Sequence, residues 1–129
     1  MGQVKIYGIE DMLNAHKERL SEVIHSCMVD ALELPPSKKF HRFFPMAREN
    51  FLFPDDRSDA YTIVEISMFA GRSVTSKKKL IALLFQRTFD SLGMSPEDLE
   101  ITILESPKSD WGIRGVPADE LNLNYRVEL

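Results

Sequence analysis

Basic residues gather where a predicted strand gives way to a predicted helix. Residues 61–85 alternate in hydropathy up to Phe69, pass through a turn at Gly71 and then take helical spacing. Arg72 stands in the turn, and three lysines at 77–79 fall in the first turns of the helix, where the macrodipole disfavours them. Free amides at a helix start beside an arginine can bind a carboxylate or phosphate. The pattern predicts an anion pocket at Arg72, unless the lysines only cover a solvent-exposed helix face.

The remaining residues that could do chemistry favour structural roles. Cys27 is the only cysteine, which excludes an internal disulfide and favours a reducing cytoplasm. It lies on an apolar helical stripe, so we interpret it as a small core residue and not as a nucleophile. His16, His25 and His41 lack metal-ligand spacing, and no zinc or P-loop motif occurs. We expect no metal and no cofactor.

Composition narrows the classes of function. A net charge of −4 and short basic clusters argue against a nucleic-acid-binding protein. No apolar run approaches the roughly 18 residues that span a bilayer, and the first residues lack the apolar core of a signal peptide. We therefore expect a cytoplasmic protein that binds neither nucleic acid nor membrane, and 129 residues suffice for one domain with an ordinary core.

The elements that must position Arg72 form a repeated unit. Residues 3–7 alternate as a strand that ends at Gly8, a helix over 13–32 stops before the prolines at 35–36, and 39–44 alternate as a second strand. The second half repeats this pattern at a constant shift of sixty residues. The matched positions are Val4 with Val64, Ile6 with Ile66, Leu20 with Leu80, Asp30 with Asp90, Leu32 with Leu92, and Pro36 with Pro96.

This repeat predicts an α+β fold built on a doubled β-α-β unit. Right-handed crossovers place both helices on one face of a four-stranded sheet, and Ser73 or Thr75 can cap the second helix. The other face stays bare. Because Val64 and its neighbours at every second position, or their alternates, are too apolar for water, we expect the chain to associate through that face.

Two further segments complete the expected single domain over 1–129, in which the pseudo-repeat covers 3–46 and 62–105. The polar connection at 45–60 contains an apolar stretch at 51–53 that could add a short strand or hairpin arm. The tail at 106–129 ends in an alternating stretch at 124–129 that predicts a small strand. Trp111, the only tryptophan, is a candidate packing anchor for this tail.

Three stretches, GRSVTSKKKLIALLF, LGMSPEDLEITILE and SDWGIRG, together with the doubled unit, resemble the tautomerase superfamily. The resemblance covers nearly the whole chain and is closest to the malonate semialdehyde decarboxylase-like branch. It implies the fold of macrophage migration inhibitory factor, a homotrimer whose three sheets line a barrel, and isomerase chemistry without a cofactor.

In that family an amino-terminal proline, exposed when the initiator methionine is removed, acts as base or acid in an arginine-lined pocket. This sequence has Gly2 at that place. Its primary amine has a reference pKa of about 7.7–8.0, so roughly a tenth to a fifth is neutral at pH 7, and a nearby Arg72 would increase that fraction. The resemblance therefore implies Gly2 as a weak catalytic base with Arg72 beside it.

The resemblance also assigns substrate contacts. Arg72 takes the place of one of two arginines that bind the substrate carboxylate, while Ala70 stands at the other. Lys38 lies near the place of the branch's acidic residue and could bind a carboxylate as a point charge. Trp111 takes the place of the tryptophan that closes the pocket. The implied function is keto–enol tautomerase or decarboxylase-like activity on a small oxo or enol carboxylic acid; the alternative is a catalytically silent trimeric binding protein.

Overall fold

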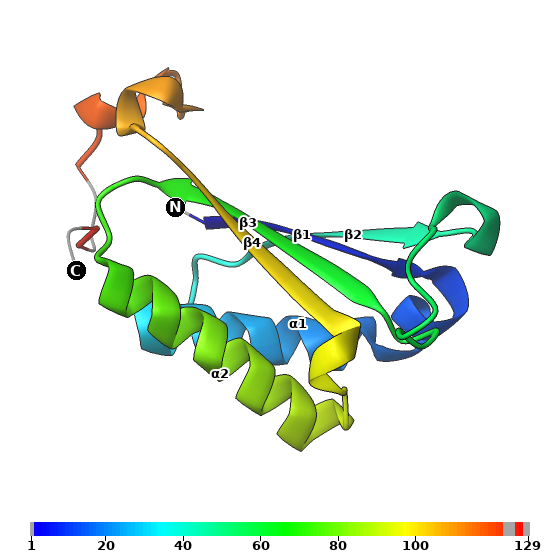
Figure 1. Cartoon of the computed structure of the whole chain (residues 1–129). Coiled ribbons are helices and arrows are strands. Elements are labelled where there is room, and N and C mark those ends of the chain that lie inside the picture. The colour runs from blue at the N-terminus through cyan, green and yellow to red at the C-terminus, as the bar shows by residue number, and fades with distance from the viewer. Residues whose placement is uncertain (1, 123–125, 128–129) are drawn as a thin grey trace.

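The computed structural model describes residues 2–122 and 126–127, and it has two layers (Figure 1). A four-stranded sheet in the order β2-β1-β3-β4 forms one layer, and two helices pack against one face as the other layer. The main elements are β1 (Gly2–Ile9), α1 (Glu10–Leu32), β2 (Phe40–Met46), β3 (Thr62–Phe69), α2 (Val74–Leu92) and β4 (Leu99–Ser106). Parallel pairs β1–β2 and β3–β4 meet through the antiparallel pair β1–β3. The doubled β-α-β prediction is confirmed.

Element ends differ from the prediction at two places. The first strand continues through Gly8 to Ile9, and α1 begins at once at Glu10, where acidic residues suit the positive helix terminus. Strand β2 runs through Pro45 to Met46. Proline is tolerated there because β2 is an edge strand and needs no ladder bond from that nitrogen.

Helix α2 is capped at both ends, by Ser73 at its amino end and by Gly93 at its carboxyl end. The side chain of Ser73 accepts a hydrogen bond from the amide of Ser76 at 3.1 Å, so Ser73 is the cap of the two predicted candidates. At the other end Gly93 has φ 65°, a left-handed conformation that suits glycine, and its amide donates to the carbonyl of Phe89.

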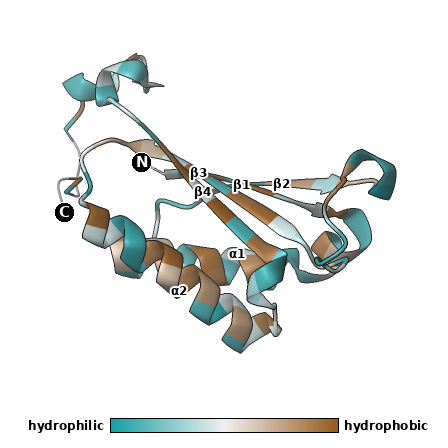
Figure 2. Cartoon of the chain, in the orientation of Figure 1, coloured by the Kyte–Doolittle hydropathy of each residue, from teal (hydrophilic) through white to brown (hydrophobic). Residues whose placement is uncertain are grey.

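The core lies between the sheet and the helices. Alternate positions of the central strands point inward, and Figure 2 shows apolar segments on the strands and both polar and apolar positions along the helices. The fully buried members include Val4, Ile6, Val64, Ile66 and Met68 from strands and Leu20, Ile24, Cys27, Leu80 and Leu84 from helices. The core assignment of Cys27 is confirmed, and burial raises the pKa of its thiol.

The bare sheet face is less apolar than predicted. Because Val64, Ile66 and Met68 point to the helices, their alternates face away, and these include Glu65 and Ser67. Polar residues also line this face on the neighbouring strands, with exposed aromatic or aliphatic side chains at its edges. The exposed apolar members are Phe40 and Phe44 on β2 and Leu104 on β4.

The connection after β2 adds no strand, contrary to the predicted arm. A 3-10 turn spans Arg48–Asn50, and then Phe51 and Phe53 pack against Tyr61 with ring centroids 5.5 and 5.0 Å from it. Leu52 between them is 88% exposed. The strand predicted for 124–129 falls largely outside the described residues.

Short elements surround β4. Two 3-10 turns flank it at Pro96–Asp98 and Lys108–Asp110, and the tail then forms a hairpin of β5 (Gly112–Ile113) and β6 (Val116–Pro117) before a last turn at Ala118–Glu120. None of the helices in the described part of the chain is long and apolar enough to cross a membrane.

Candidate active site

The element order and the strand register bring the four predicted site residues to one end of the sheet, the end at which Figure 1 marks the amino terminus. Gly2 opens β1 and pairs with Met68 near the end of β3. Arg72 follows that strand end by three residues, and Lys38 comes just before β2, whose start is parallel to that of β1. Trp111 follows the end of β4. The fold therefore places residues that are far apart in sequence at the sheet end where β1 begins.

Gly2 is buried against α1. A side-chain carbon added at this position would lie 2.6 Å from the terminal methyl of Met28, closer than real contacts allow. The side chain of Met28 therefore fills the space that a larger residue at position 2 would need. Position 2 accepts glycine because α1 places a methionine there.

Arg72 is buried and not on the surface. It is only 5% exposed, and its Nη1 donates to the carbonyl oxygen of Phe69 at 3.2 Å. A buried guanidinium interacts with other charges through a medium of lower dielectric than water, so its field at this sheet end is strong. Arg72 is therefore not a solvated surface charge.

The three lysines of α2 do not converge on Arg72. Lys77 forms an ion pair with Glu105 at 2.7 Å, with both side chains about three-quarters buried. Lys79 lies 3.4 Å from the carbonyl oxygen of Asp30 on α1, and Lys78 is exposed. The lysines thus connect α2 to β4 and α1 or face solvent. Of these four cations, only Arg72 stays a candidate for the predicted anion pocket.

Trp111 holds the tail against the sheet. Its ring meets that of Phe69 edge to face with centroids 5.1 Å apart, and its Nε1 donates to Ser106 Oγ at 2.8 Å. Ala118 is buried in the same cluster, and its amide donates to the Trp111 carbonyl. These contacts make Trp111 the anchor that the sequence suggested. The ring also borders a surface hollow of about 520 Å³ on the tail.

Lys38 stands on the opposite side of the chain start. It is half-buried in the loop after α1, where its amide donates to the carbonyl of Pro35 at 2.9 Å. Two residues later Phe40 pairs with Gln3, which places Lys38 beside the amino terminus. Lys38 and Arg72 therefore approach this end of the sheet from different strands.

Two contacts at this end were missed by the sequence reading. Met28 was assigned to the core without its contact to Gly2, which joins residues that only the folded sheet brings together. Glu105 lies in one cross-strand row with Gly2 and Met68 and carries the ion pair to Lys77. Only the strand register places it there. Among the described residues, no three His, Cys, Asp or Glu side chains could hold a metal ion.

Known proteins resemble this chain in sequence and in fold. A family model described as tautomerase enzyme matches residues 38–114. The chain is 37% identical over 57 residues to a 2-hydroxymuconate tautomerase of Pseudomonas putida, covering 44% of this chain and 90% of that protein. A solved malonate semialdehyde decarboxylase superposes with a TM-score of 0.80 at 21% identity, covering 91% of this chain and 94% of that one. A fused 4-OT, solved as a wild-type asymmetric trimer, also gives a TM-score of 0.80 at 21% identity, with 91% and 96% covered.

Proposed function

Because the chain belongs to the tautomerase enzyme family, we propose that it moves a proton on a small oxo or enol carboxylic acid. The observation that carries the proposal is the position of Gly2, which opens β1 at the sheet end where Arg72 is buried. After removal of Met1, the Gly2 amine is the general base, and Arg72 holds the substrate carboxylate. Lys38 is a second carboxylate contact, and Trp111 borders the pocket.

The proposed reaction needs one proton to leave oxygen and one to reach carbon. The neutral Gly2 amine takes the enol hydroxyl proton as the carbonyl forms, and the resulting ammonium returns a proton to the adjacent carbon. Arg72 lowers the pKa of the amine by like-charge repulsion, which keeps more of it neutral. A decarboxylase-like reaction on an oxo acid would use the same groups, with Arg72 orienting the carboxylate.

We propose that the working unit is a homotrimer. The fused 4-OT neighbour is a trimer, and within the part of the chain that the structure describes, helices cover only one of the two sheet faces. Phe40, Phe44 and Leu104 are exposed along the edge strands β2 and β4. Sedimentation equilibrium should give about three times the 14.8 kDa mass of one chain. A single-chain mass at micromolar concentration would contradict the trimer.

The substrate contact is tested with Arg72→Ala, which should weaken binding of a small keto acid by about 1.5–3 kcal/mol if the contact is charge-assisted. Lys78→Ala is the matched control, because Lys78 is an exposed cation on the helix that follows Arg72. Circular dichroism checks that each variant is folded. Equal affinity of the folded Arg72→Ala variant and the control would remove Arg72 from the site.

The alternative function is a catalytically silent binding protein of the same fold. It is favoured by Gly2 in place of the family's proline and by Met28, which fills the space beside it. Such a protein would bind the keto acid through Arg72 without accelerating its enolisation.

We also propose a cytoplasmic location for either function, because the single buried Cys27 suits a reducing compartment.

A further inference from the structure

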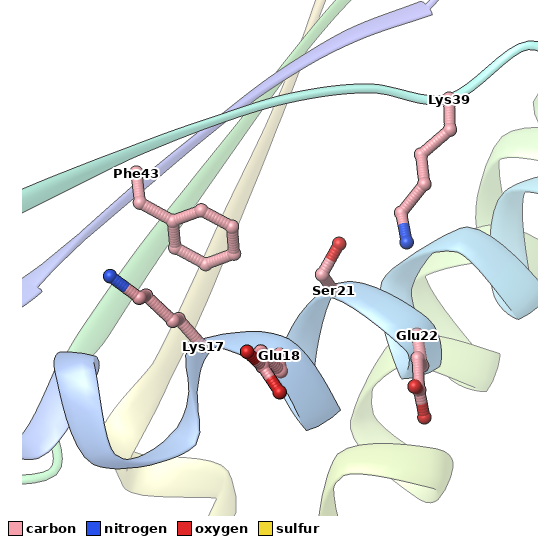
Figure 3. Close-up of a pocket in the computed structure, with 6 residues that line it drawn as sticks. All are labelled: Lys17, Glu18, Ser21, Glu22, Lys39 and Phe43. Atoms are coloured by element: carbon pink, nitrogen blue, oxygen red, sulfur yellow. The ribbon is translucent and has the colours of Figure 1, made fainter.

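A hollow of about 410 Å³ opens between α1 and the edge strand β2 (Figure 3), and none of the residues assigned to the active site lines it. The ring of Phe43 forms its apolar wall, and Ser21 on α1 supplies a hydroxyl. Lys39, just before β2, and Lys17, on α1, supply two ammonium groups. Its volume lies in the range of pockets that hold small molecules.

The charges around this hollow are arranged unevenly. Figure 3 shows the amine of Lys39 directed toward the Ser21 hydroxyl, and the chain of Lys17 extending toward the Phe43 side. The carboxylates of Glu18 and Glu22 lie on the other side of α1 in this view. All four charged side chains are exposed, and in this view the two lysine amines lie on the same side of α1 as Phe43 and the Ser21 hydroxyl. With two cations and two anions among the lining residues, a single negative charge is matched better than a dianion.

The side chain of Ser21 is positioned by a hydrogen bond with His41 on β2. It is 8% exposed, and its Oγ lies 2.8 Å from Nδ1 of His41. Burial, and then the charges of Lys39 and His25, lower the pKa of His41 to about 4, so the imidazole is neutral at pH 7. The direction of this hydrogen bond depends on the imidazole tautomer. In the tautomer that carries its proton on Nδ1, His41 donates to Ser21 Oγ, and the hydroxyl proton of Ser21 can be donated to an acceptor in the hollow.

We propose that this hollow is a second ligand site, which binds a small organic monocarboxylate with an aromatic or alkyl body. The carboxylate lies between the Lys39 amine and the Ser21 hydroxyl, and the body packs on the Phe43 ring. Lys17 closes the outer end. A carboxylate with no apolar body, such as formate, lacks the contact with Phe43. A neutral aromatic molecule lacks the contact with the Lys39 amine. Each should therefore bind more weakly.

The test is a titration of the full chain with phenylacetate, followed by amide chemical shifts in transverse-relaxation-optimised NMR spectra. We expect saturable shifts at the amides of Ser21, Lys39 and Phe43, and markedly weaker binding of the neutral analogue 2-phenylethanol. Lys39→Met should weaken phenylacetate binding about two- to five-fold, the effect of losing one partly exposed ion pair. Lys78→Met, an exposed cation on α2, should leave it unchanged.

Three results would overturn the site. The first is equal binding of phenylacetate and 2-phenylethanol, which would remove the carboxylate contact. The second is shifts confined to the Gly2 end of the sheet, which would assign all binding to the catalytic site. The third combines two observations: the amides of Ser21 and Phe43 do not shift, and the Lys39→Met variant has an altered mass in sedimentation. Together these would show that the hollow is a contact between copies of the chain. Because Lys39 is outside the proposed catalytic machinery, none of these results alters the proposed function.

Discussion

The contact between Gly2 and Met28 predicts how the chain responds to a proline at position 2. An added side-chain carbon there lies 2.6 Å from the Met28 methyl, about 0.8 Å short of the ordinary contact of 3.4 Å. Met28 is 2% exposed, so its methyl must move within a packed core. Overpacking costs about 1–3 kcal/mol, and the low end of this range applies here because the methyl is the far end of a flexible side chain. Gly2→Pro alone should therefore lower the free energy of unfolding by about 1 kcal/mol.

Met28→Val removes the atoms in the way. Met28→Val alone should lower the free energy of unfolding by about 1–2 kcal/mol, because it shortens a buried side chain. Combined with Gly2→Pro, Met28→Val should lower the free energy of unfolding by less than the sum of the two single losses, with a coupling energy of about 1 kcal/mol between the two positions. Urea unfolding of the four proteins in this cycle gives the coupling directly, and intact mass confirms that Met1 is absent from each.

The same pair predicts activity. Once Met28 no longer displaces the ring, the secondary amine that proline supplies at position 2 of the double variant should accelerate enol–keto conversion of phenylenolpyruvate above both the wild type and Gly2→Pro. General-base catalysis contributes about 10²–10⁴-fold, so partial recovery is measurable. Additive unfolding energies would refute the steric argument. A correctly processed, trimeric double variant no faster than buffer would favour the binding-protein alternative.

Three further predictions concern stability and reactivity. Because the pKa of His41 falls from 6.5 to about 4 on folding, the unfolded chain binds the proton more readily, and stability should drop by up to about 3 kcal/mol as pH falls through that window. His41→Gln should flatten this part of the urea-derived pH profile, whereas His16→Gln on the exposed face of α1 should not. Asp98→Ala should cost about 1–3 kcal/mol, because the buried carboxylate accepts the Ser58 amide at 2.7 Å and its hydroxyl at 2.5 Å; an unchanged urea midpoint would dismiss this anchor. Cys27, buried and with a raised pKa, should react with a disulfide reagent only after unfolding, and prompt labelling of the folded chain would contradict its burial.

Much of the fold could be predicted because local patterns and topology agree. The shift of sixty residues reproduced strand, helix and strand in order, and the cap at Ser73 followed from side-chain chemistry. The polarity of the open sheet face could not be predicted, because alternation alone leaves two choices for which residues of β3 point inward. The aromatic stretch at 51–53 has strand propensity, but contact with Tyr61 decided its conformation.

The placement of the candidate site residues in the fold could be predicted in part. The order of strands follows from the doubled unit, and it places Gly2, Lys38, Arg72 and Trp111 at one end of the sheet. The burial of Arg72 and the Met28 methyl beside Gly2 depend on packing between elements distant in sequence. The spread of the lysines is likewise set by partners on α1 and β4. No periodicity encodes such contacts.

The most direct test of the proposed function is the rate of enol–keto conversion of phenylenolpyruvate by the wild-type chain that begins at Gly2, with its mass verified. The account predicts a rate above that of buffer, and a loss of that excess when one added residue precedes Gly2 and removes the amine from the sheet end. A rate equal to buffer, or an unchanged rate in the extended chain, would contradict the assignment of the Gly2 amine as the base.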